Sequence, residues 1–268
     1  MSGTGRDAGT GRGANGGRGA SRQPGEHIVS FEPKDVASQR RVAFGVASAA
    51  YGLFRLTSKM RIENAQALPV GQGTIVAAYH ANHLDPILVG LAVWRSGRLP
   101  HFLAKSTLFS GPLGVILKGL GQIPVLRASA QAGDSLEYAK EALQKGETVV
   151  IYPEGTLTKD EHFWPERFKS GTARLALETG APIVPAAHWG LETVKPRGRL
   201  IPRPRPLTHT SVVRFGEPLD YTDLWEHRGE RSSMATLTTR LTNTIAGMVA
   251  DLSGRELPER FRTEEAGS

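Results

Sequence analysis

Beyond residue 70, short apolar segments typical of strands alternate with longer segments typical of helices. This alternation predicts one α/β domain with a largely parallel or mixed central sheet flanked by helices. The predicted strands are Thr74–Tyr79, His101–Ala104, Gln122–Leu126, Thr148–Tyr152, Ile183–Ala187 and Ser211–Phe215. The predicted helices are Pro86–Trp94, Ser135–Lys145, Thr172–Thr179 and Met234–Leu252, with Asp134 and Glu137 as a capping box and Gly146 and Gly180 as helix stops.

Composition divides the chain into three parts. Residues 1–26 are rich in glycine and arginine and lack large apolar side chains, which predicts a disordered tail. Residues 27–64 contain a nearly apolar run from Val42 to Phe54 that is flanked by arginines. As a helix this run is about 20 Å long, shorter than the roughly 30 Å hydrocarbon core of a bilayer. We expect it either to lie at a membrane interface or to pack on the domain that residues 65–268 form.

The chain carries a formal net charge of +7 and contains no cysteine. The missing cysteines exclude disulfides, cysteine-ligated metal centres and a cysteine nucleophile. A basic chain can bind nucleic acid, an anionic membrane or phosphorylated substrates. Many of the cations lie in the glycine-rich tail and in the proline-rich segment 195–206, without interleaved aromatic side chains. We therefore expect an anionic membrane surface and no nucleic acid as partner, and a non-catalytic basic binder is the less favoured alternative.

The segment Tyr79–Pro86, which reads YHANHLDP, follows a predicted strand directly. A strand end presents a base rigidly, and a nearby carboxylate can hold imidazole in one tautomer, so His80 and Asp85 are candidates for a general base and its partner. No G-x-S-x-G motif supplies a nucleophile, so His80 would activate a substrate hydroxyl directly. The alternative is a metal-dependent hydrolase with His80, His83 and Asp85 as ligands, although the other histidines downstream are isolated in the sequence.

A second segment, Ile151–Asp160, reads IYPEGTLTKD and also begins at a strand end. A Pro-Glu-Gly-Thr turn can bind an anion or a hydroxyl through its backbone amides and the Thr156 hydroxyl. Glu154 is a candidate either to orient a substrate or to stabilise the turn itself.

The order of these two segments resembles the glycerophospholipid acyltransferase family, of the 1-acyl-sn-glycerol-3-phosphate acyltransferase (lysophosphatidic acid acyltransferase) type. That family has H-x4-D followed some 70 residues later by P-E-G-T. Two further blocks are similar to it: GQIPVLR at residues 121–127 and IVPAA at residues 183–187. The resemblance covers about residues 73–191 with the blocks in the family's order.

The resemblance implies an enzyme that moves a fatty acyl group to the free hydroxyl of 1-acyl-sn-glycerol-3-phosphate, giving phosphatidic acid in phospholipid biosynthesis. His80 would be the general base and Asp85 would orient it. The residues that would bind the acceptor are Glu154, Gly155, Thr156, Lys105, Arg127 and Lys159. No cofactor and no metal are expected beyond acyl-CoA or acyl carrier protein as co-substrate, and the expected location is the cytoplasmic face of the cell membrane.

The chain departs from the family at one position that concerns the acceptor. The family's arginine after E-G-T, which would contact phosphate, is Leu157 here. An apolar side chain cannot replace a guanidinium fork, so Lys159, Arg127 or Lys169 would have to supply the missing charge. The alternative is a member of the same family that acts on another lyso-lipid or glycolipid.

Overall fold

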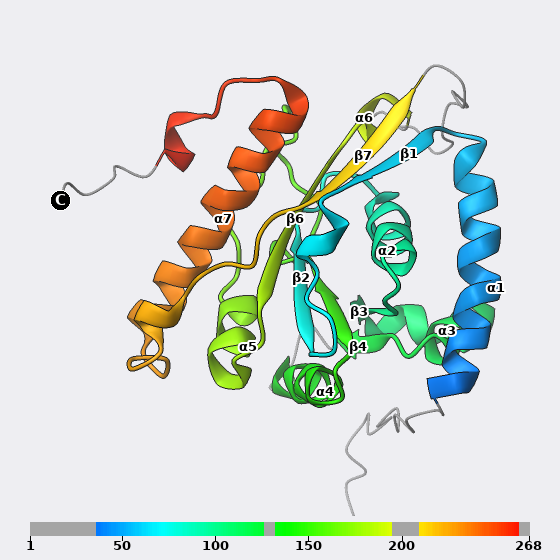
Figure 1. Cartoon of the computed structure of the whole chain (residues 1–268), viewed down its shortest axis with the longest axis horizontal. Helices are drawn as coiled ribbons and strands as arrows, with labels where there is room; N and C mark the ends of the chain where they lie inside the picture. Colours follow the sequence, from blue (N-terminus) through cyan, green and yellow to red (C-terminus); the bar gives the residue numbers. More distant parts are fainter. Residues whose placement is uncertain (1–35, 126–131, 195–208, 263–268) are drawn as a thin grey trace, which may run out of the picture. The chain divides into compact units, whose positions relative to one another are not determined.

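A seven-stranded sheet forms the centre of the fold (Figure 1), and the computed structural model describes residues 36–125, 132–194 and 209–262. The strands are β1 (Lys59–Glu63), β2 (Thr74–Ala78), β3 (Pro100–Lys105), β4 (Ile123–Val125), β5 (Thr148–Ile151), β6 (Ile183–Trp189) and β7 (Thr210–Phe215). Their order in the sheet is β1-β7-β6-β2-β5-β3-β4. The five strands from β6 to β4 run parallel, whereas β7 is antiparallel to β6 and parallel to β1. The predicted α/β fold with a mixed sheet is therefore confirmed.

Helices cover both faces of the sheet, as Figure 1 shows. They are α1 (Val36–Arg55), α2 (Asp85–Arg95), α3 (Gly111–Gly119), α4 (Ala132–Gln144), α5 (Gly171–Thr179), α6 (Leu191–Val194) and α7 (Arg231–Ser253). Short 3-10 turns lie at Ala65–Ala67, Ser106–Phe109, Thr222–Leu224 and Glu259–Phe261. Helices α4, α5 and α7 contribute to the core on one face, and α2 packs on the other with α1 outside it.

The central strand β2 shows why the sheet needs both helical layers. All five of its residues are buried, and they alternate between the two faces as side chains of a strand must. Ile75 and Ala77 belong to the core beneath α4, α5 and α7, whereas Val76 and Ala78 belong to the core beneath α2. A strand buried on both faces is continuously apolar, which is typical of parallel sheets.

Helix α1 packs against α2 through one side and exposes another. Ala43 and Phe54 are buried, whereas Phe44 and Leu53 are 65% and 67% exposed. The guanidinium of Arg95 lies over the ring of Tyr51 at 4.8 Å, which ties the two helices together. The expectation that residues 42–54 form a helix packed on the domain is confirmed for this buried side. Among the described helices, none combines the length and the apolar character that crossing a bilayer requires.

Strand β1, helix α3 and the single-turn helix α6 were not predicted from the sequence. Strand β1, with the sequence KMRIE, lies at the edge of the sheet beside β7, so only one of its sides needs apolar residues. Helix α3 contains three glycines and a proline, which hide its helical character. Its Gly114 is required because a Cβ there would lie 2.2 Å from the backbone of Phe109.

The predicted helix boundaries were partly right. Gly180 has a φ of +71° and its N–H donates to the carbonyl of Ala176, so it ends α5 as predicted. Gly146, with a φ of +78°, lies two residues beyond the end of α4, and its N–H donates to the carbonyl of Leu143. The capping box was wrong, because α4 begins at Ala132 and Asp134 lies inside the helix. The predicted tail 1–26, the basic segment 195–206 and Arg127 lie outside the described residues.

Candidate active site

The candidate residues gather at the carboxyl edge of the parallel strands. His80 follows β2, Lys105 is the last residue of β3, and Glu154 follows β5. Because these strands are parallel, their carboxyl ends meet at one edge, where open α/β sheets bind their ligands. The predicted segments 79–86 and 151–160 are therefore neighbours in space, as their position after adjacent strands requires.

His80 and Asp85 form a hydrogen-bonded pair. The Nδ1 of His80 lies 3.2 Å from Oδ2 of Asp85, whose side chain is fully buried while that of His80 is 19% exposed. A carboxylate only accepts hydrogen bonds, so this contact places the proton of a neutral His80 on Nδ1. Nε2 then carries the free lone pair. The arrangement gives an accessible base whose tautomer is fixed by a buried carboxylate.

The intervening turn holds Asp85 in place. The N–H of Asn82 donates to Oδ2 of Asp85 at 2.7 Å, and the N–H of Leu84 donates to Oδ1 of Asn82 at 3.1 Å. These bonds close the turn between β2 and α2. Pro86 lies in the first turn of α2, where a residue without an N–H costs no helical hydrogen bond. The local sequence thus fixes the five-residue spacing between base and carboxylate.

Two hydrogen bonds that involve the His80 main chain join it to the segment of the Pro-Glu-Gly-Thr turn. The N–H of His80 donates to Oε1 of Glu154 at 3.1 Å, and the N–H of Thr158 donates to the carbonyl of His80 at 2.7 Å. Glu154 is buried, and burial raises the pKa of its carboxyl to about 7. Its position against the His80 backbone supports a role in stabilising the site.

Gly155 gives the turn its shape. Its φ is +70°, a left-handed conformation that glycine adopts without the steric cost of a Cβ. A Cβ at this position would lie only 2.8 Å from Nζ of Lys169, so a cation rests against the turn. Thr156 is exposed beside it. A turn with an exposed hydroxyl and an adjacent ammonium group suits an anionic ligand.

An aromatic side chain covers the His80 ring. The ring of Tyr152 stacks on that of His80 with centroids 4.5 Å apart, and Phe102 lies 6.3 Å beyond it. The hydroxyl of Tyr152 is buried and has no hydrogen-bond partner among the described residues. The sequence analysis did not single out Tyr152, although it stands two residues before Glu154 at the end of a strand.

His188, which the sequence analysis treated as isolated, belongs to this site. Its Nε2 lies 3.3 Å from Oδ2 of Asp85, and its ring is buried. The residues of β6 at alternate positions, Val184 and Ala186, face the core on the α2 side, so His188 faces α2 as well. The two residues are 103 positions apart in the chain, and only the pairing of β6 with β2 brings them together.

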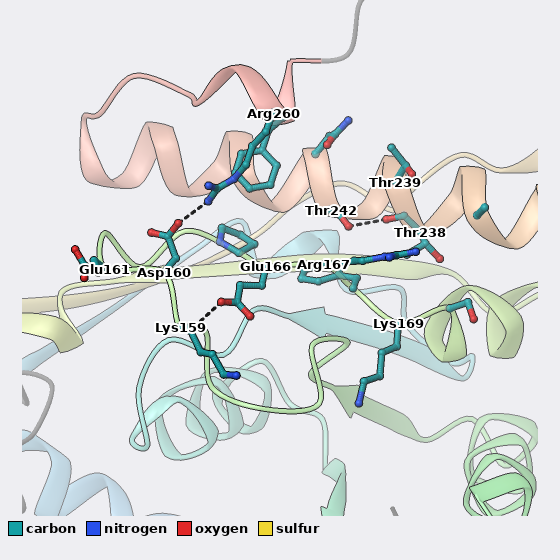
Figure 2. A pocket seen from close by; sticks show the side chains of 16 residues that line it. Lys159, Asp160, Glu161, Glu166, Arg167, Lys169, Thr238, Thr239, Thr242 and Arg260 are labelled. Atoms are coloured by element: carbon teal, nitrogen blue, oxygen red, sulfur yellow. Dashed lines mark hydrogen bonds and ion pairs between the residues drawn. The ribbon is translucent and has the colours of Figure 1, made fainter.

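The predicted cations lie in two places. Lys105 is exposed at the end of β3, on the same edge as His80. Lys159 lines a groove of about 1220 Å³ between residues 159–170 and α7, together with Arg167 and Lys169 (Figure 2). In that view Lys159 and Lys169 both point away from α7. His80, Asp85 and Glu154 do not line this groove.

The metal-ligand alternative finds no support in the described part of the chain. His83 is exposed in the turn, and His101 is buried elsewhere, with its Nδ1 2.9 Å from the carbonyl of Gly121. Across residues 36–125, 132–194 and 209–262, no three histidine, aspartate or glutamate side chains are grouped so as to hold a metal ion.

Comparisons with known proteins show what the chain as a whole is similar to. The family model described as Acyltransferase matches residues 59–189. The 1-acyl-sn-glycerol-3-phosphate acyltransferase of Bacillus subtilis is 28% identical over 206 residues, which are 74% of this chain and 92% of that protein. The chloroplastic enzyme of the same name from Brassica napus is 30% identical over 142 residues, 52% of this chain and 40% of that protein.

A solved structure shares the fold. The crystal structure of the 1-acyl-sn-glycerophosphate acyltransferase PlsC from Thermotoga maritima superposes with a TM-score of 0.65 at 24% identity, covering 85% of this chain and 87% of that one.

Proposed function

The chain belongs to the acyltransferase family through residues 59–189, and we propose on that basis that it transfers a fatty acyl group to the free hydroxyl of 1-acyl-sn-glycerol-3-phosphate. The product is phosphatidic acid. The observation that supports this most strongly is the His80–Asp85 pair, which leaves an accessible imidazole nitrogen beside the Pro-Glu-Gly-Thr turn.

In the proposed reaction the acceptor hydroxyl attacks the thioester carbonyl of acyl-CoA or acyl carrier protein. His80 takes the hydroxyl proton on Nε2 as the new C–O bond forms. Asp85 stabilises the resulting imidazolium through Nδ1–H. General-base assistance of this kind contributes about 10²–10⁴ in rate. Holding the hydroxyl and the thioester together supplies much of the rest.

The second half of the transfer returns the proton. The tetrahedral intermediate collapses, the C–S bond breaks, and the imidazolium of His80 gives its proton to the departing thiolate. No covalent acyl-enzyme forms, which agrees with a chain that has no cysteine. The thioester already carries an activated acyl group, so no cofactor is needed.

The acceptor phosphate would bind at the Pro-Glu-Gly-Thr turn. Gly155 and Thr156 offer a backbone nest and a hydroxyl there, and Nζ of Lys169 lies against the same turn. Lys169 is therefore the described cation that best replaces the guanidinium absent at Leu157. Lys105 at the end of β3 is the second candidate, and Arg127 and Lys159 complete the proposed set.

A different acceptor within the same chemistry is the alternative. Leu157 is partly buried where the family has arginine, and no apolar side chain binds phosphate. A lyso-lipid or glycolipid without a terminal phosphate would leave the His80 chemistry unchanged and would need no such arginine.

We further propose that the enzyme works at the cytoplasmic face of an anionic membrane, because its lipid acceptor resides there. The exposed apolar side chains of α1 and of the α3 region support this location. They are Val42, Phe44, Leu53, Leu56, Leu108, Leu113, Val115 and Ile116. Helices α1 and α3 contact each other, and exposed cations at Arg55 and Lys118 accompany them. An apolar surface bordered by cations suits lipid tails and phosphate headgroups.

The acceptor is tested with purified protein, one acyl-CoA, and pairs of acceptors that differ only in the phosphate. We expect transfer to 1-acyl-sn-glycerol-3-phosphate at a kcat/KM at least tenfold above that for the matched monoacylglycerol. Equal rates for both members of the pair would overturn the phosphate acceptor and favour the alternative.

A further inference from the structure

His188 is held between two acceptors inside the core. Its Nε2 lies 3.3 Å from Oδ2 of Asp85 and 3.3 Å from the carbonyl oxygen of Tyr79. The Tyr79 ring stacks on it with centroids 4.6 Å apart, and the Tyr79 hydroxyl donates to the His188 carbonyl at 2.8 Å. Both neighbours of Nε2 accept hydrogen bonds, so this nitrogen carries a proton. The ring is 2% exposed, and these contacts hold it in one orientation.

The proposed reaction creates a need that His188 can meet. Asp85 is fully buried, and a buried carboxylate without a positive partner is strongly destabilising. His80 cannot be that partner at rest, because a base must be neutral before it takes a proton. In the described part of the chain, the ion-pair contacts of Asp85 are to His80 and His188 alone. His188 is therefore the residue available to neutralise Asp85.

The charges around His188 agree with a protonated ring. Burial alone would lower the pKa of His188, but the charge and hydrogen bond of Asp85 outweigh burial and raise it above its ordinary value. Burial alone would raise the pKa of Asp85, but the charge and hydrogen bond of His188, with a further bond from His80, lower it. The other titratable groups near the ring are Tyr79, from the end of β2, and Glu192 of α6, while Arg255 interacts with Tyr79 from beyond α7.

We propose that His188 is a positioning residue for the acyl transfer: its protonated ring neutralises Asp85 and holds Oδ2 where it fixes the neutral tautomer of His80. Oδ1 of Asp85 is buried and has no hydrogen-bond partner among the described residues, so the orientation of the carboxylate depends on the donors to Oδ2. This role rests on the proposed function, in which His80 is the base.

The charge of His188 has a measurable consequence. Both rings contact the same oxygen of Asp85, so a positive His188 opposes a second positive charge on His80. This repulsion favours the return of the proton from the His80 imidazolium to the leaving thiolate.

Three variants separate this role from simple packing. His188→Gln keeps an amide donor close to the position of Nε2 but removes the titrating ring. His188→Leu removes the donor as well. The matched control is His101→Gln. His101 is another buried histidine, lies on strand β3 of the same sheet and contacts a backbone carbonyl.

We expect His188→Leu to lower kcat at least 30-fold while KM for both substrates changes less than threefold. In His188→Gln, kcat at the optimum stays within about fivefold, and the acidic limb of the pH profile of kcat/KM moves up by at least half a pH unit. His101→Gln changes neither quantity. A folded His188→Leu variant with kcat within threefold of the parent, or a His188→Gln profile with an unmoved acidic limb, would overturn the proposal.

A measurement that needs no substrate separates the test of His188 from the test of acyl transfer. In ¹⁵N-histidine NMR, the neutral His80 ring is expected to carry its proton on Nδ1 alone in the parent and to populate both tautomers in His188→Leu, whether or not a given lipid is a substrate. An unchanged Nδ1–H tautomer in His188→Leu refutes the role of His188, whereas a changed tautomer in a protein that transfers no acyl group refutes only the proposed function.

Discussion

The main-chain N–H of His80 donates a hydrogen bond to Oε1 of Glu154 at 3.1 Å, although 74 positions separate the two residues in the chain. This bond joins the base to the turn that would hold the acceptor. A rigid link of this kind supports catalysis because the reacting groups must be held within a fraction of an ångström of their productive geometry.

The buried carboxyl of Glu154 predicts a pH dependence of stability. Burial raises its pKa to about 7 from an ordinary value of 4.5, so between these pH values the folded state holds a proton that the unfolded chain has lost. The free energy of unfolding therefore carries a contribution that is fully present below about pH 4.5 and is lost as the pH rises to 7, at most about 3 kcal/mol. In Glu154→Gln this loss disappears. The free energy of unfolding, measured in urea, should therefore differ less between pH 5 and pH 8 than it does in the parent.

Glu226→Gln, at an exposed position, is the control for the removal of one carboxylate. The same pH 5 to pH 8 difference in Glu154→Gln as in the parent would contradict the role given to burial.

Gly155 is expected to be required for acceptor binding. Alanine there must adopt a φ near +70°, which costs roughly 1–2 kcal/mol, and its Cβ displaces the ammonium group of Lys169. We expect Gly155→Ala to raise KM for the phosphate acceptor at least fivefold with a smaller change for the acyl donor. Gly254→Ala, at a φ of +66° with open space around its Cβ, carries the same backbone strain outside the Pro-Glu-Gly-Thr turn. An equal KM in both variants would show that strain, and not the displaced cation, matters.

Leu157→Arg tests the identity of the acceptor by adding a cation at the turn. A guanidinium beside the Pro-Glu-Gly-Thr turn would add a charge-assisted bond to phosphate, worth about 1.5–3 kcal/mol when well formed. Because Leu157 is only partly buried, we expect a gain at the low end of this energy range, which corresponds to a roughly tenfold lower KM for 1-acyl-sn-glycerol-3-phosphate. Leu157→Met controls for loss of the leucine, and a matched acceptor without phosphate should show no gain with either variant. A gain of similar size with both acceptors would mean that the phosphate does not bind at this turn.

The exposed apolar side chains predict binding to anionic vesicles. Deleting everything before residue 66 would remove strand β1, so substitutions are the better test. The triple change Phe44→Ser, Leu53→Ser and Val115→Ser should weaken cosedimentation with phosphatidylglycerol-containing vesicles at least tenfold, because each of these side chains is exposed on α1 or α3.

Val70→Ser, at a side chain that is 94% exposed outside these two helices, is the control for loss of surface apolarity. Unchanged vesicle binding of the triple variant would contradict the membrane surface assigned to α1 and α3.

The strands and helices that carry strong periodic patterns were predictable from the sequence, and so was the His80–Asp85 pair. Both depend on short-range order: β2 is apolar from Ile75 to Ala78, and a five-residue turn connects the base to its carboxylate. Strand β1 and helix α3 were missed, since one is an edge strand with charged residues and the other contains glycines that its packing requires.

The contacts around Asp85 show the limit of reasoning along the chain. His188 stands in a strand whose other residues are apolar, and nothing in its local sequence indicates a partner. Its contact with Asp85 follows from the order of strands in the sheet, which places β6 beside β2. The position of Lys169 against Gly155 likewise follows from the path of residues 159–170 and not from spacing.

The most direct test of the account compares His80→Ala with His83→Ala in an assay of acyl transfer from acyl-CoA to 1-acyl-sn-glycerol-3-phosphate. The two histidines lie in the same turn, but His83 is exposed, and of the two only His80 contacts Asp85. We predict that kcat falls about 10²–10⁴-fold in His80→Ala. His83→Ala should stay within twofold of the parent, and both variants should keep its thermal stability. A His80→Ala enzyme that retained more than a tenth of the parent rate would contradict the assignment of His80 as the base.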